Sequence, residues 1–397
     1  MNHNGLKYQL ADLKQVIKKW LYIENDNVID VIAATYIANR FEADPIWMII
    51  IGPPSNTKTE LLRAFDGHEN AYFISNITPS TLVSGIIPKK GKPEPSLLPK
   101  LNDKVVILKD FTTVLSMRSE NQQEILAQLR EAYDGQYSKM FGNGKVINWK
   151  GRFGLMAACT PVYDSHYGVI GSMGERFLLY RTENKDGLKM GLQAQKIVGR
   201  EEEMRTEIKV AVHRFINQFD RTNAAHLPNH KDAKDMILFL ALFVSYGRCP
   251  VERDYRDRCV KYHPIPEGTA RLVKQFEQIG IGLALANGKN TIDLEVYETI
   301  KKIGCDLIPA LRFILIEHLW NERAWEYLLG WKKTKDIADG VNMPATTVKM
   351  ILEDLMVVGI LNRDIDDDDG RTPYKWQLNN RICEWIGNAG VFDASDS

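Results

Sequence analysis

The sequence predicts an α/β protein built on a parallel sheet that helices cover. Between residues 45 and 187, segments of helical periodicity alternate with the short apolar runs IWMIII, AYFIS, KVVILK, RFGLMAAC and FLLYR. Runs this apolar suit strands that are buried on both faces, as the strands of parallel sheets are. We therefore expect an α/β core over residues 45–187.

The segments on either side of this core predict three further parts. Residues 1–44 place apolar side chains at spacings of three and four, which predicts an N-terminal helical segment. Residues 188–312 are mostly of helical pattern and predict an all-helical domain. Residues 313–397 give a helix, a short helix, a turn, a longer helix and two strands joined by an acidic tip. This is the order of a winged helix-turn-helix.

Composition and charge favour no partner over the whole chain. The 51 basic and 51 acidic residues balance, so any basic surface is local. No run approaches the ~18 apolar residues of a membrane helix, and the first residues lack an apolar signal core. The five cysteines are scattered, and Cys249, Cys259 and His263 lack the close pairing of a zinc site. These features predict a cytoplasmic protein with reduced thiols.

The stretch GPPSNTKT, residues 52–59, is close to a phosphate-binding loop. It follows an apolar run and continues into a helical pattern, but Thr57 replaces the second glycine of the motif. Loop amides and a helix N-terminus bind phosphate oxygens, while Lys58 would reach the β and γ phosphates and Thr59 would ligate Mg²⁺. The alternative is a proline-rich turn before a core helix. The predicted nucleotide-binding residues are Gly52, Pro53, Pro54, Ser55, Asn56, Thr57, Lys58 and Thr59.

Three residues farther along the chain fit the remaining parts of a nucleotide hydrolase. Asp110 ends the apolar run of residues 104–109, where a nucleotide hydrolase places an acid that holds Mg²⁺ or polarises water. Since the sequence there is KDF, Asp110 fills either role and Lys109 occupies the other place. Thr160 ends the run LMAAC and offers a hydroxyl that orients a water. Arg176 begins the last run and suits an arginine finger for a neighbouring subunit.

In order and spacing these segments resemble AAA+ ATPases, and among them the MCM-like replicative helicases with an insert in the second helix. The MCM loop also departs from glycine at the position of Thr57, where it has alanine. Residues 78–100, rich in Pro, Gly and Lys, fall where that group carries its insert. GERF resembles the arginine-finger motif, and GTARLVKQFEQ resembles the helix with the sensor 2 arginine, here Arg271. At Thr160, MCM proteins carry asparagine.

The resemblance spans roughly residues 45–310 and implies an AAA+ P-loop NTPase fold with a helical lid domain. It implies ATP and Mg²⁺ as cofactors and a ring, hexameric in this group, with ATP between subunits. It also implies that Asp110 serves hydrolysis, Thr160 senses the γ-phosphate, Arg176 acts across the interface and Arg271 senses from the lid. The segment LREAYDGQYSKMFGNGKVINWKGRFGLMAACTP resembles the MCM helix, hairpin and sensor strand.

Residues 136–152 predict a basic β-hairpin for contact with nucleic acid. Polar and apolar residues alternate on both sides of GNG, and the segment contains no acid. A ring of such hairpins would line a pore with positive charge. The predicted contacts are Lys145 at the tip, with Lys139 and Lys150; the alternative is a solvated hairpin that packs on the sheet. Lys89, Lys90 and Lys92 of the insert suit phosphate contact or a plain surface loop equally.

The sequence therefore predicts an ATP-hydrolysing AAA+ motor that moves or remodels DNA, as a helicase or translocase in replication of a phage or mobile element. Two other functions stay open. One is an ATP-switched DNA-binding regulator that reads duplex DNA with its winged helix. The other is a protein-remodelling AAA+ ATPase. Because the acidic wing tip, residues 364–369, repels phosphates, the winged helix suits protein contact as well as DNA.

Overall fold

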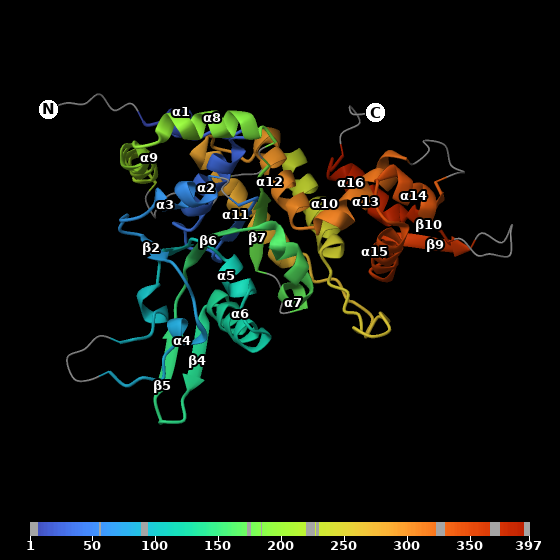
Figure 1. Ribbon diagram of the computed structural model, residues 1–397, viewed down its shortest axis with the longest axis horizontal. Helices are drawn as coiled ribbons and strands as arrows, with labels where there is room; N and C mark the ends of the chain where they lie inside the picture. Colours follow the sequence, from blue (N-terminus) through green and yellow to red (C-terminus); the bar gives the residue numbers. More distant parts are fainter. Residues whose placement is uncertain are drawn as a thin grey trace. The chain divides into compact units, whose positions relative to one another are not determined.

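The computed structural model describes residues 7–54, 57–88, 94–172, 176–183, 185–219, 227, 230–322, 330–365 and 374–392 (Figure 1). The chain forms two compact units. The first consists of Met1–Asn229 and Glu277–Thr299, and the second of His230–Phe276 and Ile300–Ser397. Ser55, Asn56, Lys89, Lys90, Lys92 and the wing-tip residues 366–369 lie outside the described residues.

The helices of residues 188–312 are divided between the two units. α8 (Gly187–Ile197) and α9 (Glu201–Ile216) belong to the first unit, and α10 (Lys231–Gly247) belongs to the second. The boundaries between the units fall inside α11 (Ala270–Ala286) and α12 (Leu294–Asp306). A change in periodicity along the sequence cannot locate a boundary that lies within a continuous helix.

The first unit contains a five-stranded parallel sheet, which confirms the predicted α/β fold. The order is β2-β3-β6-β1-β7, so the first strand lies between the last two. Each strand coincides with one of the apolar runs. The strands are β1 (Trp47–Ile51), β2 (Ala71–Ile74), β3 (Val105–Leu108), β6 (Gly154–Cys159) and β7 (Phe177–Arg181).

Helices cover the sheet on both sides. Figure 1 draws α2 (Asn27–Ala38) and α3 (Lys58–Arg63) on one side, and α5 (Thr112–Leu115), α6 (Ser119–Tyr133) and α7 (Tyr167–Ser172) on the other. Every residue of β1, β3 and β6 is buried as a result. This burial is the reason that these strands read as continuous apolar runs instead of alternating ones.

The position of β1 depends on a polar contact at its first residues. The Asn39 side chain accepts a hydrogen bond from the Ile46 backbone N–H and donates one to the Ile46 carbonyl, both at 2.9 Å. Gly154 of the neighbouring β6 leaves room for this amide, because a Cβ there would lie 2.3 Å from Asn39 Cγ. The glycine thus allows the close approach that fixes where the central strand begins.

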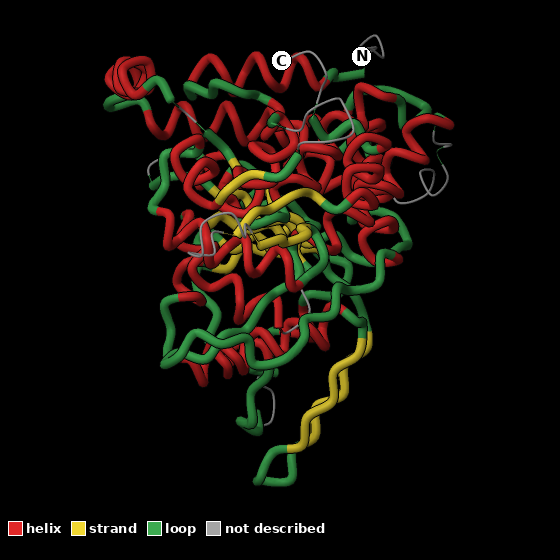
Figure 2. The backbone as a smooth tube through the Cα atoms, turned by 90° about the vertical axis from the view of Figure 1, so that its right-hand side faces the viewer, coloured by secondary structure: helices red, strands yellow, loops and turns green. Residues whose placement is uncertain are grey.

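The predicted hairpin forms between β3 and β6 and consists of β4 (Gln136–Met140) and β5 (Val146–Lys150). Its antiparallel register pairs Gln136 with Lys150 and Met140 with Val146. Figure 2 shows it as two strands that extend away from the parallel sheet. The predicted insert contains α4 (Pro79–Leu82) and the 3-10 turn η1 (Leu98–Lys100), while its described residues 83–88 and 94–97 form no helix or strand.

The second unit contains the short helix, the longer helix and the two strands predicted near the C-terminus, which are α14 (Thr334–Gly340), α15 (Ala345–Val357), β9 (Leu361–Ile365) and β10 (Tyr374–Leu378). The helix predicted before them, over residues 324–330, lies outside the described residues except for Gly330, and α13 (Ala310–Asn321) precedes it in the chain. Two further elements were not predicted, namely β8 (Lys332–Lys333), which completes a sheet of order β8-β10-β9, and α16 (Asn380–Asn388). A two-residue strand offers too little pattern to be seen in a sequence.

The N-terminal helices α1 (Leu10–Trp20) and α2 confirm the helical prediction for the described part of residues 1–44. α2 places one acid in an otherwise apolar interior. Asp30 is only 7 % exposed, and its carboxylate lies 2.7 Å from Lys14 Nζ. Burial raises the pKa of Asp30 to about 6, because loss of solvation outweighs the opposing hydrogen bond from Lys14.

Asp30 is expected to make the fold less stable as the pH rises. Its pKa is about 6 in the folded protein and near 3.8 when unfolded, so its contribution is full below pH 4 and is lost through pH 6. The loss amounts to roughly 3 kcal/mol at most. Urea unfolding at several pH values should show a flatter profile for Asp30→Asn. Lys14→Met, which removes the cation, should shift the wild-type transition to higher pH. Identical profiles for wild type and Asp30→Asn would contradict this assignment.

Candidate functional site

The connections of the sheet create a crevice at the carboxyl ends of β1 and β6. These strands are neighbours, yet the chain leaves β1 toward β2 on one edge and leaves β6 toward β7 on the other. Right-handed crossovers in opposite directions lie on opposite faces of a sheet. Open α/β sheets bind ligands in the crevice that such a reversal produces.

A cavity of about 390 Å³ lies at this end of the sheet. It brings together residues that are far apart in the sequence, from the loop after β1, the end of β3 and the end of β6. Its volume falls in the usual range of ~300–1,000 Å³ for small-molecule sites. The lining residues are Pro54, Thr57, Lys58, Thr59, Glu60, Lys109, Asp110, Ala158, Cys159 and Thr160.

Thr57 has a left-handed backbone, with φ 33° and ψ −17°. Glycine adopts this region freely, whereas a β-branched residue pays ~1–2 kcal/mol for it. The phosphate-loop pattern has glycine at this position, and the left-handed backbone explains why glycine is preferred there. This sequence is unusual because it places threonine in that conformation. Strain of this kind clusters at functional sites.

Lys58 is the first residue of α3, and its side chain is buried at 7 % exposure. Its ammonium donates to the carbonyls of Gly52 at 2.7 Å and Pro53 at 2.5 Å. Burial lowers the Lys58 pKa, and the acidic groups Cys159 and Asp110 oppose that shift. An anion in the cavity would offer this ammonium a stronger, charge-assisted partner than neutral carbonyls do.

Asp110 and Lys109 follow β3 and both line the cavity, but their side chains are engaged differently. Asp110 is exposed, and its Oδ1 accepts a hydrogen bond from the Thr112 N–H at 2.9 Å. The ammonium of Lys109 lies over the ring of Phe73, 5.2 Å from its centre. The charge of Lys109 therefore lies against an aromatic ring of β2, and Asp110 is the acid at the end of β3 that lines the cavity.

Thr112 links Asp110 with Thr160 and was not singled out from the sequence. Its hydroxyl accepts a hydrogen bond from the Thr160 N–H at 3.2 Å and lies 3.4 Å from the Thr160 hydroxyl. The same oxygen lies 3.6 Å from the sulfur of Cys159. The signal in the sequence is the run KDFTT, which places hydroxyls just after the acid. Burial raises the pKa of Cys159 to about 11, so this thiol stays protonated.

The two predicted arginines make other contacts. Arg176 is not among the residues that line the cavity; its Nη2 donates to both carboxylate oxygens of Asp134, at 3.1 and 3.3 Å. Arg271 belongs to the second unit, where it lies 3.7 Å from Glu267. Arg181, at the end of β7, was not singled out from the sequence. Its guanidinium forms a two-bond ion pair with Asp164 at 2.7 and 2.8 Å.

The hairpin lysines differ in how far their charge is available. Lys145 lies at the turn as expected, but its side chain is 11 % exposed and bonds the carbonyls of Ser84 and Ile86 and the carboxylate of Glu94. The expected contact of Lys145 with nucleic acid stays a prediction, and in the structure its ammonium is engaged by the insert. The bond from Lys145 lowers the pKa of Glu94 to about 2. Lys145 therefore holds the insert against the hairpin.

The other two lysines lie along the strands. Lys139 pairs with Glu124 of α6 at 3.0 Å, and Lys150 is exposed. Among the described residues, the exposed large apolar side chains near the tip are Ile86 and Ile87 of the insert with Met140 and Val146 of the hairpin, and the polar Asn143 of the turn is exposed as well.

No protein-family model matches this sequence, and no curated protein matches it significantly. Among the described residues, no group of three or more His, Cys, Asp or Glu side chains could hold a metal ion. Within the same part of the chain, every helix is too short or too polar to cross a membrane.

Replacing Thr57 by glycine is expected to raise the free energy of unfolding by about 0.5 kcal/mol, because the relief of left-handed strain exceeds the entropic cost of glycine. Urea unfolding measures this difference. The control is Asn342→Gly, which changes another positive-φ residue (52°) but gains less, since asparagine tolerates this region. A Thr57→Gly variant less stable than the wild type would rule out strain at this position.

Proposed function

We propose that this chain is an ATP-binding and ATP-hydrolysing AAA+ P-loop ATPase that acts on DNA. The observation that carries the proposal is the cavity, which gathers Lys58, Thr59, Asp110 and Thr160 at the carboxyl ends of three parallel strands. The sequence alone singled out these residues for phosphate, Mg²⁺, hydrolysis and γ-phosphate sensing. Their convergence in one crevice supports those roles, because residues that matched the motifs by chance would not be expected to lie next to one another in the fold.

The residues present suit a nucleotide with Mg²⁺. Lys58 supplies a buried ammonium for the β and γ phosphates, and the Thr59 hydroxyl and Asp110 carboxylate are oxygen ligands of the kind Mg²⁺ takes. Bound Mg²⁺ would neutralise charge on the phosphates. Thr57 holds the loop in the conformation that precedes α3, and Thr160 offers its hydroxyl to orient the attacking water.

Asp110 is the better candidate for the hydrolytic acid, and Lys109 does not replace a second carboxylate. The ammonium of Lys109 lies over the ring of Phe73, 5.2 Å from its centre, so this cation is engaged with β2. Thr112 bonds Asp110 and lies beside Thr160, which ties the acid to the γ-phosphate sensor. We assign Thr112 the role of orienting these two groups.

The proposal extends to assembly and to the other parts of the chain. In a hexameric ring, Arg176 is proposed to act on the ATP of a neighbouring subunit, for which its side chain, 11 % exposed, would have to leave Asp134 and the Tyr133 ring. Arg271 would act as a sensor from a helical lid. The elements from α13 to β10 are proposed to form a winged helix.

The ATPase reaction is the first test. Wild type should hydrolyse ATP with Mg²⁺, and single-stranded DNA should stimulate it. Lys58→Ala should lose ATP binding, whereas Asp110→Asn should bind ATP and lose roughly 10²–10³ in kcat, the usual effect of removing one electrostatic stabiliser. The control is Arg200→Ala, which removes an exposed pair with Glu203. A wild type that binds no ATP would overturn the proposal.

The exposed apolar tip favours one alternative, a protein-remodelling AAA+ ATPase. Ile86, Ile87 and Met140 are each more than 60 % exposed, while the nearby cation Lys145 is taken up by the insert. Apolar side chains that project from a hairpin suit contact with an extended polypeptide as well as with bases. DNA remains the preferred partner because the hairpin strands contain no acid and Lys150 is exposed, although Lys139 pairs with Glu124 of α6.

Binding measurements separate DNA from polypeptide. If DNA is the substrate, Lys150→Ala should weaken binding of single-stranded DNA several-fold and reduce the slope of log K against log salt by about 0.7. Met140→Ser with Ile87→Ser should then change DNA binding little. Fluorescence anisotropy at several salt concentrations measures both. The reverse pattern, with stimulation of the ATPase by an unfolded polypeptide that the serine variant abolishes, would support remodelling.

A further inference from the structure

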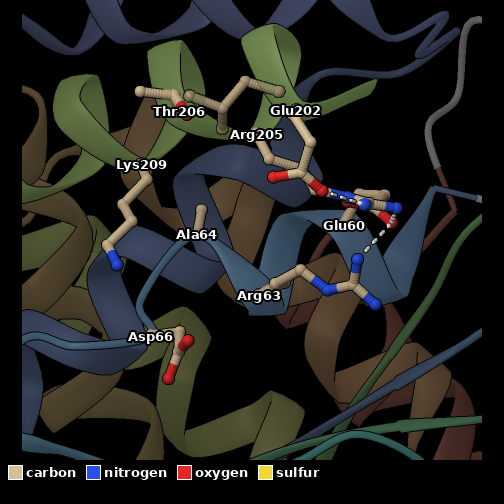
Figure 3. Close-up of a pocket in the computed structure, with 9 residues that line it drawn as sticks. Glu60, Arg63, Ala64, Asp66, Glu202, Arg205, Thr206 and Lys209 are labelled. Atoms are coloured by element: carbon tan, nitrogen blue, oxygen red, sulfur yellow. Dashed lines mark hydrogen bonds and ion pairs between the residues drawn. The ribbon is translucent and has the colours of Figure 1, made fainter. Parts of the chain in front are cut away.

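A second cavity, of about 300 Å³, lies between α3 and α9 on the far side of the phosphate-binding helix (Figure 3). Its walls are strongly charged. The residues that line it are Glu60, Arg63, Ala64, Asp66, Glu202, Arg205, Thr206, Ile208 and Lys209. Glu60 lines this cavity and also the nucleotide cavity. Glu60 is therefore a side chain that the two cavities share.

Two arginines hold the Glu60 carboxylate. Arg205 of α9 donates from Nε at 3.1 Å and from Nη2 at 3.3 Å, one bond to each carboxylate oxygen. Arg63 of α3 itself lies 3.2 Å from the same carboxylate. Figure 3 shows these three side chains gathered on one wall, while Lys209 and Asp66 lie apart from them. The two-bond geometry of Arg205 fixes direction as well as distance.

The phosphate-binding helix depends on such a contact because it is short. α3 has six residues, follows the strained Thr57 and buries only Lys58, Leu61 and Leu62. α9 has sixteen residues and buries six apolar ones, so it is the firmer of the two. A displacement of α3 would move Lys58 and Thr59 together, since they are its first two residues.

We propose that Arg205 is a positioning residue for the nucleotide site, which acts through Glu60 to hold α3 and thereby aligns Lys58 and Thr59 with the phosphates. This inference rests on the proposed ATPase function. Arg205 touches no nucleotide in this scheme. It aligns the groups that do, in the way that residues behind a binding site fix the geometry of those in front.

A second explanation for the same contact is charge neutralisation. Without Arg205, the Glu60 carboxylate would keep Arg63 as a counter-charge at 3.2 Å but would be less fully neutralised beside the phosphate site, and it would repel the nucleotide more. The two explanations predict different ATP affinities for the double variant, in which Glu60→Gln is added to Arg205→Ala. Glutamine removes the repulsion but cannot restore the alignment, because its partner is missing.

The test measures ATP affinity with Mg²⁺, kcat and KM for the wild type, Arg205→Ala, Arg205→Lys and the double variant Arg205→Ala with Glu60→Gln. We expect Arg205→Ala to weaken ATP binding about tenfold, in line with the loss of a charge-assisted two-bond contact. Arg205→Lys should recover part of the loss, because lysine keeps the charge and one hydrogen bond. The double variant should remain as weak as Arg205→Ala.

Several outcomes would overturn the inference. One is normal ATP affinity for Arg205→Ala. Another is recovery in the double variant, which would assign the effect to repulsion. A third is an equal loss in the control Arg200→Ala, which changes the N-cap residue of α9 five positions earlier. Thermal unfolding accompanies each variant. A drop in ATP affinity for Arg205→Ala with an unchanged unfolding temperature supports positioning, whereas a drop explained by partial unfolding counts against it. Absence of ATP binding by the wild type would instead refute the ATPase proposal itself.

Discussion

The burial of β1 between two parallel neighbours is the constraint on which the rest of the structure depends. Trp47–Ile51 contributes no charged side chain, and its backbone pairs with β6 on one side and β7 on the other. A strand buried on both faces must be apolar along its whole length. Polar chemistry is thereby excluded from the sheet and confined to its carboxyl edge, where the chain leaves β1, β3 and β6.

The carboxyl edge concentrates groups that would be costly elsewhere in the fold. The buried ammonium of Lys58, the left-handed Thr57 and the exposed Asp110 all lie around one cavity. A buried cation is tolerated here because it bonds two loop carbonyls. Strain and a partly desolvated charge at the same place are typical of a site prepared for a ligand, and in the proposed function that ligand is the phosphate chain of ATP.

The hairpin and the insert illustrate how tertiary contacts decide whether a charged side chain is available to a partner. Residues 136–152 carry only basic charged residues, yet Lys145 reaches back to Glu94 and to two carbonyls of the insert. One segment supplies the cation and another, some fifty residues earlier, supplies the anion. The result is a tip whose exposed surface is more apolar than the sequence of the hairpin suggests.

The sequence by itself determined the five strands, the hairpin and the residues at the strand ends, because apolar runs and turn residues are local signals. It also located Lys58, Thr59, Asp110 and Thr160 before their convergence was visible. Only the tertiary structure decided that Lys109 lies over Phe73, that Thr112 joins Asp110 to Thr160, and that Arg205 holds Glu60. Each of these contacts joins side chains on different elements, and the partner of a charged side chain depends on which elements the fold brings together.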